Sequence, residues 1–471
     1  MKQGILNFKS KYIGDRNFYK GVLAVAIPMM VQNGITNLVS LLDNIMVGRL
    51  GTEAMSGISI VNQFIFIFNL LIFGAVSAAG IFTAQYYGLG DNEGIKHTFR
   101  FKFIVNLAAA LIGIAVFLVF DEPIINLFLF ESDSTGDLAL TMNYGKEYLY
   151  VMLIGLVPYA ISQVYASTMR ETGDSVIPMV ASIVAVVTNF FLNIILIFGY
   201  LGFPALGVVG AAIATVVSRF AELITLTVYA HTHKDKFPYL KGAYSSPKIS
   251  RELFGRITVK GIPLMLNEFF WAIAMTMRNQ CYSTRGLDVV AAQNISTTVF
   301  NLFSVVYMAL GSSVAIIIGK QLGAGERDEA IDTQRKLTAF SIFSGTVMML
   351  FMIGASFLFP KIYNTTDTVR SLAAFMMIIS GIGMPFSSFA NAAYFTLRSG
   401  GRVFITVLFD SVYMWAVVMP VSIVFSYFTD ISIFLLFPIC QWVDSLKVIF
   451  GAILLKRGNW ARTLVTKTEE L

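Results

Sequence analysis

Eight ionisable residues of this sequence lie inside long apolar stretches, where few polar neighbours are available along the chain. In a hydrocarbon environment a charged side chain costs at least about 2.5 kcal/mol, so each of these residues is a functional candidate by default. The carboxylates among them could bind a proton, pair with Na⁺ or attract an organic cation. The eight residues are Asp43, Arg219, Glu222, Glu268, Arg278, Asp410, Asp444 and Lys447.

Two acids in the second half of the chain have neighbours that suit a coupling ion. Glu268 follows Asn267 and precedes three aromatic residues that end at Trp271, so its surroundings are apolar. There a carboxylate can bind a proton or pair with Na⁺; the alternative is a structural acid hydrogen-bonded to a neighbouring helix. Asp410 lies eight residues into a later apolar stretch and is either the partner of Glu268 or a structural acid. A Na⁺ site at Glu268 and Asp410 would be one form of this coupling.

The remaining charges fall into two pairs and one exception. The members of each pair are three residues apart and therefore share a helix face. We interpret both as neutralised, structural ion pairs: Arg219 with Glu222, and Asp444 with Lys447. Arg278 could instead face Asp43 in the other half of the chain, or extend its guanidinium to the outer membrane interface, which we favour. The residues that we expect to line a substrate cavity are Asn33, Asn267, Trp271 and Arg278.

The elements that hold these residues are apolar helices. The chain of 471 residues is 56% hydrophobic and 13% charged, with a mean hydropathy of +0.71, whereas globular chains are about 25% charged. Apolar runs of 20 or more residues recur along its length, and each can cross a bilayer. We therefore predict an all-α polytopic membrane protein with twelve spans near residues 22–47, 56–86, 97–120, 142–168, 176–199, 206–230, 255–282, 290–320, 335–359, 368–396, 402–427 and 431–455.

The two halves of the chain repeat each other. Residues 27–100 align without a gap to residues 262–335, at an offset of 235, with 13 of 74 pairs identical. The identities include proline and glycine landmarks, such as Pro28 with Pro263 and Gly51 with Gly286. We predict an N-terminal six-helix lobe at 1–231, a linker at 232–254 and a C-terminal six-helix lobe at 255–471.

Basic residues predict the orientation in the membrane. If the N-terminus is cytoplasmic, 26 of the 34 Lys and Arg residues lie in cytoplasmic segments and five lie outside. The positive-inside rule therefore places both termini and the linker in the cytoplasm. Six helices per half, an even number, leave both halves in the same orientation, so a pseudo-two-fold axis along the membrane normal should relate them.

Several stretches resemble the MATE (multidrug and toxic compound extrusion) family, whose superfamily also contains flippases for lipid-linked precursors. These stretches occur in the family's order and cover nearly the whole chain. NEFFW points toward the branch common in Gram-positive bacteria. The stretches are LLDNIMVGRLG at 41–51, QYYGLGDNE at 85–93, the 29 residues at 187–215, IPLMLNEFFW at 262–271, KQLGAGERDE at 320–329 and LRSGG at 397–401.

The resemblance implies roles for several residues. Asp43 matches the first-helix acid that some members use for protonation or Na⁺ binding; the alternative is a loop-capping acid at the outer end of its helix. The companions of that acid in the fifth helix are an Asn and an Asp, and here they read Asn189 and Asn193, so one charge of the family pattern is missing. The family also uses an acid in the seventh helix, which supports a coupling role for Glu268.

Absent motifs exclude other classes of protein. The sequence has no phosphate-binding loop, no H-E-x-x-H pair and no filter-like loop, so an ATP-driven pump, a metalloenzyme and a channel are disfavoured. We expect a secondary antiporter, not an enzyme, that exports amphipathic organic cations or drugs in exchange for Na⁺ or H⁺. We expect no cofactor beyond that ion, no nucleic-acid partner, a monomer, and residence in the bacterial inner membrane. A lipid-linked precursor flippase is the alternative.

Overall fold

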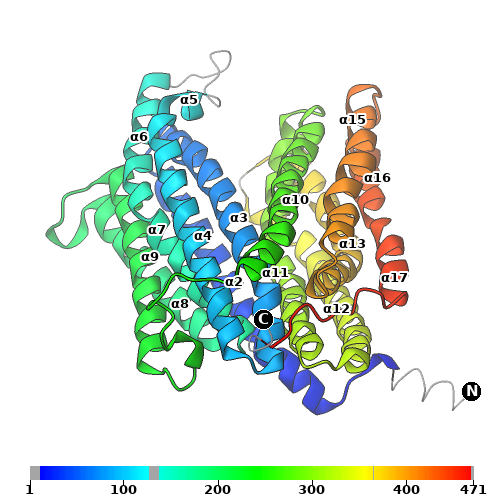
Figure 1. The fold of residues 1–471 in the computed structure, drawn as a ribbon. Helices are drawn as coiled ribbons and strands as arrows, with labels where there is room; N and C mark the ends of the chain where they lie inside the picture. Colours follow the sequence, from blue (N-terminus) through cyan, green and yellow to red (C-terminus); the bar gives the residue numbers. More distant parts are fainter. Residues whose placement is uncertain (1–10, 127–136, 364, 468–471) are drawn as a thin grey trace, which may run out of the picture. The chain divides into compact units, whose positions relative to one another are not determined.

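The structure, a computed structural model of the chain, describes residues 11–126, 137–363 and 365–467. Over these ranges it is helical, with no strand (Figure 1). The elements are α2 (Arg16–Gly48), α3 (Thr52–Leu89), α4 (Asn92–Val119), α5 (Asp121–Asn126), α6 (Leu138–Ile154), α7 (Leu156–Glu171), α8 (Val176–Phe198), η1 (Tyr200–Gly202), α9 (Gly207–Thr232), η2 (Pro238–Leu240), α10 (Arg251–Ser283), α11 (Leu287–Gly323), α12 (Arg327–Ser356), η3 (Phe359–Ile362), α13 (Asp367–Ser399), α14 (Val403–Val407), η4 (Leu408–Val412), η5 (Met414–Val418), α15 (Met419–Tyr427), α16 (Ile433–Ser445) and α17 (Lys447–Lys456).

These helices confirm the predicted membrane protein with twelve spans. In the described residues, eleven helical segments are long and apolar enough to cross a bilayer. The bent pair α6 and α7 supplies the twelfth. Each of the twelve predicted ranges overlaps one of these segments. Between the third and fourth spans lies the short helix α5, and the residues after it, 127–136, lie outside the described part of the chain.

Three of the spans are irregular where the sequence suggests straight helices. The fourth bends by 46° at Gly155, where an added Cβ would lie 3.1 Å from the side chains of Arg219 and Val216. The eleventh contains two π-helical segments, η4 and η5, and η4 includes Asp410. The last breaks at Leu446, between α16 and α17. π-Helical turns often occur at functional sites.

The repeat is also visible in the backbone. Gly51 and Gly286, at corresponding positions, have φ angles of 111° and 107°, and Gly90 and Gly325 have φ angles of 75° and 81°. Side chains rarely tolerate such angles, so glycine is required at both pairs. The two halves of the chain therefore end their first two helices with the same turns.

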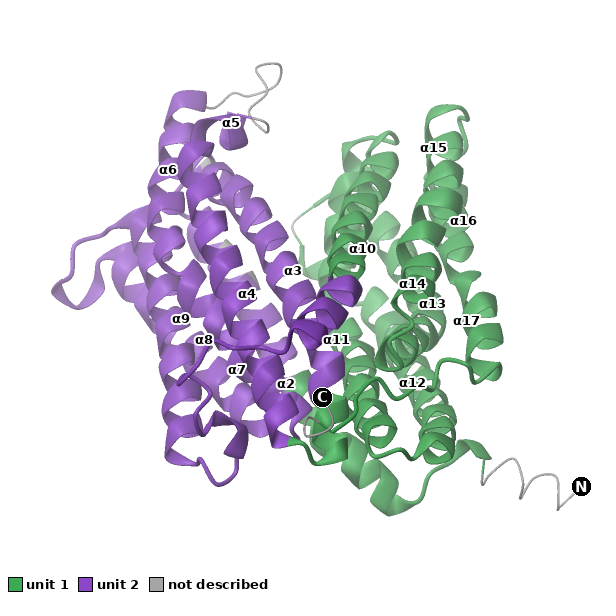
Figure 2. Cartoon of the chain, viewed as in Figure 1, with its two compact units in different colours: residues 1–30, 84–91, 262–471 green, residues 31–83, 92–261 purple. Residues whose placement is uncertain are grey.

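The helices form two compact units (Figure 2). Unit 1 contains residues 1–30, 84–91 and 262–471, and unit 2 contains residues 31–83 and 92–261. Three helices contribute to both units: α2, α3 and α10. The predicted lobe boundaries, with the linker at 232–254, follow the sequence repeat and stay a prediction.

The segment after α9 packs on unit 2. Arg100 of α4 donates hydrogen bonds to the carbonyl oxygens of Gly242 and Ala243 at 2.8 and 2.7 Å. Lys236 lies 2.7 Å from the Asp174 carboxylate, and this hydrogen bond raises the pKa of the Lys236 ammonium group. The segment is thus held by one helix of unit 2 and by the turn after α7.

Candidate coupling and substrate sites

Asp43 lies in unit 2 with the two asparagines of α8. Asn193 Nδ2 donates a hydrogen bond to Asp43 Oδ1 at 2.7 Å. With its amide nitrogen facing Asp43, Asn189 donates to Oδ1 and Oδ2 at 3.0 and 3.1 Å and accepts from Thr215 at 3.3 Å; in the opposite amide orientation its oxygen accepts from Asn193 Nδ2 at 3.1 Å. Asn189 and Asn193 are both buried. The structure therefore brings together the three residues that we expected to act jointly.

The partners of Asp43 in unit 2 are neutral. Its hydrogen bonds come from the amides of Asn189 and Asn193. Within the described part of this unit, no basic side chain forms an ion pair with Asp43. When it is ionised, the negative charge of such a carboxylate could be neutralised by a proton or by an external cation.

Glu268 lies in unit 1, where α10 faces α13. The hydroxyl of Tyr394 donates to Glu268 Oε1 at 2.8 Å, and Arg398 Nη1 lies 3.6 Å from the same oxygen. Arg398 is 2% exposed. This carboxylate is therefore paired with a buried cation.

Asp410 lies beside Glu268 in the same unit. Asn267 Nδ2 donates to Asp410 Oδ2 at 3.0 Å and approaches the Tyr394 hydroxyl at 3.4 Å, which links the two acids through one amide and one phenol. The backbone N–H of Ser411 donates to Asn267 Oδ1 at 3.2 Å, and the Ser411 hydroxyl donates to the Asn267 carbonyl at 2.7 Å. The Lys447 ammonium lies 4.0 Å from Asp410 Oδ1.

The network continues along α16 and α17. Lys447 pairs with Asp444 at 3.1 Å, which confirms the predicted ion pair. Asp444 also lies 3.6 Å from Arg278 Nη1. Arg278 is 8% exposed, and its Nε and Nη1 atoms have no hydrogen-bond partner. The interpretation that Arg278 extends to the interface is therefore wrong, because the side chain turns inward to an acid; its pairing with Asp43 stays a prediction.

This network has as many cations as acids. Its acids are Glu268, Asp410 and Asp444, and its cations are Arg278, Arg398 and Lys447. A Na⁺ ion at Glu268 and Asp410 would add a fourth positive charge beside Arg398 and Lys447. Electrostatics therefore disfavours the predicted Na⁺ site. Among the described residues, no group of three or more His, Cys, Asp or Glu side chains could hold a metal ion.

The sequence repeat relates the polar contacts of the two units. Gln32 Nε2 donates to the Ser182 hydroxyl at 2.7 Å in unit 2. At the offset of 235, Gln32 corresponds to Asn267. Later in the chain, TMRETG at 168–173 matches TLRSGG at 396–401 at an offset of 228, and at this offset Ser182 corresponds to Asp410. The Asn267–Asp410 hydrogen bond therefore repeats the Gln32–Ser182 bond, with an acid in place of a hydroxyl.

The other ion pair predicted from the sequence, between Arg219 and Glu222, has a different outcome. Among the ion pairs of the described residues none joins Arg219 to Glu222, so that predicted pair is wrong. Arg219 donates to the Gly155 carbonyl at 3.2 Å and lies 5.0 Å from the Tyr159 ring. Glu222 accepts from the Ser182 hydroxyl at 3.0 Å. The bend at Gly155 supplies Arg219 with a carbonyl, and so the arginine turns away from the acid.

The two remaining cavity residues lie apart from these networks. Asn33 is exposed on α2, and Trp271 is partly buried on α10. Trp415 of η5 donates its indole N–H to the carbonyl of Phe270 at 3.0 Å, which fixes the chain just before Trp271. A role for Asn33 and Trp271 in the cavity stays a prediction.

Sequence reasoning missed an ion pair in unit 2. Lys102 of α4 pairs with Glu171 of α7, and its ammonium also lies 3.2 Å from the hydroxyls of Ser167 and Thr168. Lys102 is fully buried. A Cβ at Gly80 would collide with the Glu171 carboxylate. The sequence signal for this buried charge is the position of Lys102 inside the third predicted span, at 97–120.

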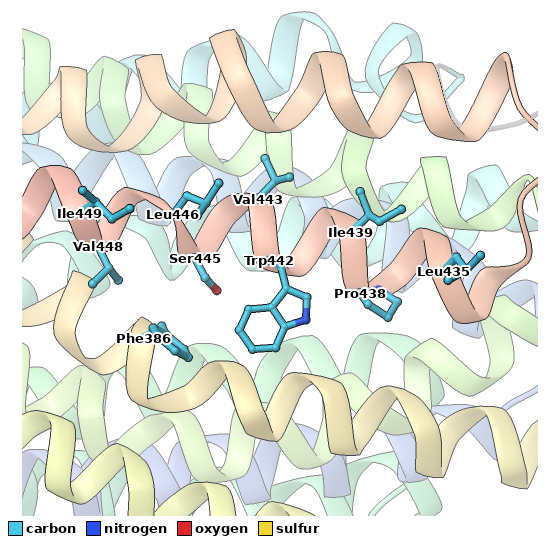
Figure 3. Close-up of a pocket in the computed structure, with 10 residues that line it drawn as sticks. All are labelled: Phe386, Leu435, Pro438, Ile439, Trp442, Val443, Ser445, Leu446, Val448 and Ile449. Atoms are coloured by element: carbon cyan, nitrogen blue, oxygen red, sulfur yellow. The ribbon is translucent and has the colours of Figure 1, made fainter.

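An apolar pocket lies elsewhere in unit 1, between α13 and the α16–α17 break (Figure 3). Its volume is about 620 Å³, and Phe386 of α13 lies beside Trp442 of α16 in its lining. The two rings meet edge to face with centroids 5.7 Å apart. The pocket contains none of the residues predicted to bind ion or substrate. It is lined by Phe386, Leu435, Pro438, Ile439, Trp442, Val443, Ser445, Leu446, Val448 and Ile449.

Similar proteins are known for almost the full length of the chain. It is 25% identical over 465 residues to a probable multidrug resistance protein NorM of Thermotoga maritima, covering 96% of this chain and 95% of that protein. It is 25% identical over 412 residues to the probable multidrug resistance protein YoeA of Bacillus subtilis, covering 86% and 87%. A crystal structure of a mutant Vibrio cholerae MATE transporter, VcmN, has the same fold, with a TM-score of 0.83, 16% identity and coverage of 94% and 98%.

The family model named MatE matches the chain twice, at residues 28–195 and 263–428. The two matches begin at repeat-related prolines, Pro28 and Pro263. Together they make up more than half of the chain, so it belongs to the MatE family of membrane transporters.

Proposed function

We propose that this protein is a secondary antiporter of the bacterial inner membrane that exports amphipathic organic cations in exchange for H⁺. Relatives named as probable multidrug resistance proteins support the substrate class. The exchange would proceed by alternating access, with a monomer as the transporting unit and both termini in the cytoplasm.

The Asp43 site carries this proposal. Its carboxylate accepts hydrogen bonds from the amides of Asn189 and Asn193, and among the described residues of unit 2 no basic side chain pairs with it. An organic cation would be attracted by the negative charge of the ionised carboxylate, and a proton would remove that charge. The organic cation and the proton would therefore compete for Asp43. This competition would couple the export of the cation to the entry of the proton.

One carboxylate favours H⁺ over Na⁺ as the coupling ion. The amides of Asn189 and Asn193 point N–H groups at Asp43, whereas Na⁺ requires oxygen ligands. A second carboxylate at position 193 would add both an oxygen ligand and a charge. In the Glu268–Asp410 network each acid faces a basic residue. We expect this network to stabilise unit 1 and to be required for efflux, whereas Asp43 binds the proton or the organic cation.

A flippase for lipid-linked precursors is less well supported. Recognition of a pyrophosphate would need basic side chains that are not already paired with an acid of the protein. In unit 1, Arg278, Arg398 and Lys447 each face an acid, and in unit 2 Lys102 pairs with Glu171. The charge of these four residues is already matched inside the protein, whereas Arg219 of unit 2 bonds the Gly155 carbonyl and lies over the Tyr159 ring.

A binding experiment tests the assignment of Asp43. The purified protein would be titrated with a fluorescent lipophilic cation at a series of pH values. We expect affinity to fall about tenfold per pH unit below the titration of Asp43, and Asp43→Asn to bind weakly at every pH. Asn62→Asp, which adds an acid to a different polar position of the same unit, serves as the matched control. Equal affinity of wild type and Asp43→Asn at all pH values would refute the assignment.

A further inference from the structure

The ends of two repeat-related helices cross inside unit 1. Residues 84–91 of α3 pack against the end of α11. A Cβ at Gly88 would collide with the carbonyl oxygen of Lys320, and a Cβ at Gly323 would collide with that of Gln85. Gly88 and Gly323 correspond in the repeat, as do Gln85 and Lys320. The same close approach is therefore made from both sides, and only glycine permits it.

Gln85 lies at the centre of this crossing and is fully buried. Its Nε2 donates to the carbonyl oxygens of Ser399 and Arg462 at 3.0 and 3.2 Å. Its Oε1 accepts from the backbone N–H of Leu464 at 2.6 Å. One side chain of the first half of the chain thus binds the end of α13 and two positions of the C-terminal tail.

The tail, residues 459–465, forms a strap over the crossing that begins with a turn at 459–460 and continues as irregular backbone. Trp460 is 2% exposed, and its carbonyl oxygen lies where a Cβ of Gly400 would be. Thr463 donates its hydroxyl hydrogen to the Leu322 carbonyl at 2.7 Å, one residue before Gly323. The strap therefore contacts α11 directly and α3 through Gln85.

We propose that the strap is a latch that holds the α3–α11 crossing closed, and that Gln85 is the residue that positions it. The inference rests on the proposed alternating access. Lys320 and both termini belong to segments that the basic-residue pattern places in the cytoplasm. The crossing joins helix ends from both halves of the sequence inside unit 1, so in the proposed cycle opening toward the cytoplasm would require the crossing to separate and Gln85 to release the tail.

The hydrogen bonds of Gln85 have the strength that such a latch needs. Three backbone groups of the protein lose their partner when the side chain is removed. Even weak net contributions from each would shift a two-state equilibrium by about tenfold or more. Interactions of this size can be broken and remade in every transport cycle.

A labelling experiment tests whether Gln85 holds the tail. Leu464→Cys would be the single thiol in a chain that also carries Cys281→Ala and Cys440→Ala. In proteoliposomes we expect N-ethylmaleimide to label it at least fivefold faster when Gln85→Ala is added. Gln321→Ala is the matched control, because Gln321 bonds Thr333 and Glu329 of α12; it should leave the rate unchanged. Equal rates for Gln85→Ala and its parent would overturn the proposal.

A second experiment tests whether release is needed for transport. Gln85→Cys with Leu464→Cys would be joined by a short bifunctional methanethiosulfonate, with a monofunctional reagent as the control. We expect at least a tenfold loss of efflux that a reductant reverses. Retained efflux after cross-linking would mean that the tail stays bound throughout transport, and would overturn the latch. Absence of gradient-driven efflux in the wild type would instead overturn the proposed function. If Gln85→Ala does not fold, Thr463→Val at the exposed position 463 replaces it, because this change removes the hydrogen bond to the Leu322 carbonyl. It should raise the labelling rate of Leu464→Cys about twofold, and an unchanged rate would overturn the latch.

Discussion

Asp43 is the residue whose chemistry the function depends on most directly. Asp43→Asn keeps the size of the side chain and removes its charge, and so we expect loss of at least tenfold in efflux with normal expression. Asn193→Asp adds the charge that the family pattern has and this chain lacks, and should shift the pH or Na⁺ dependence of efflux. The measurement is dye efflux from proteoliposomes. Wild-type pH dependence in Asp43→Asn would exclude Asp43 and leave the unit 1 acids as the coupling site.

A substitution at Glu268 tests whether the unit 1 network takes part in ion coupling or only stabilises the fold. Glu268→Gln removes the carboxylate that faces the buried Arg398, and loss of one partner of such a pair destabilises a fold by about 3–5 kcal/mol. We expect ion-coupled efflux to be abolished and the melting temperature to fall, with the protein still expressed. Tyr394→Phe, which removes only the hydroxyl bound to Glu268, is the milder control. Full efflux per folded Glu268→Gln molecule, with unchanged ion dependence, would make Glu268 purely structural.

At the level of single residues, the sequence identified the acids better than their partners. Asp43, Glu268 and Asp410 stand out because apolar neighbours surround them in the chain. Their contacts come from distant positions, and Tyr394 and Arg398 gave no local signal. Arg398 lies near the end of a span, where a basic residue is expected at the cytoplasmic interface, and only packing shows that it turns inward.

The helices that carry these residues have their own buried charges. The Lys102–Glu171 pair joins α4 to α7, with Lys102 fully buried. Glu171→Gln or Lys102→Met should lower the free energy of unfolding by about 3–5 kcal/mol, because each leaves one buried charge behind. The double variant should recover most of that loss. Thermal unfolding in detergent measures this.

The Lys96–Glu93 pair on α4, in which the Glu93 side chain is 60% exposed, provides the control for that series. Ion pairs open to solvent contribute about 0–1 kcal/mol, so Glu93→Gln should leave the melting temperature almost unchanged. Equal effects of Glu93→Gln and Glu171→Gln would mean that burial of the Lys102 pair has no energetic importance.

The spans themselves were predictable because twenty apolar residues in a row have few alternatives to a membrane helix. Their interruptions were not. The bend at Gly155 depends on close packing against Arg219 and Val216, and the π-helical segments around Asp410 depend on contacts with α10. Both causes lie far away in the sequence.

The orientation of the whole molecule in the membrane is predicted from its basic residues. Lys248 lies in the exposed segment between α9 and α10, and so Lys248→Cys should resist an impermeant thiol reagent applied to intact cells. Lys361→Cys, at an exposed position of η3 that the same pattern places outside, should label readily. Native cysteines would be replaced first. The reverse labelling pattern would invert the orientation.

Coupled exchange is the central claim, and flux under separate ion gradients tests it most directly. Proteoliposomes of the purified protein would be loaded with a fluorescent lipophilic cation and given either a pH gradient or a Na⁺ gradient, with the membrane potential clamped. Cation export driven by the pH gradient alone, and absent in Asp43→Asn, is the result that the account predicts. Export driven only by the Na⁺ gradient would contradict the assignment of H⁺ as the coupling ion, and no response to either gradient would contradict antiport itself.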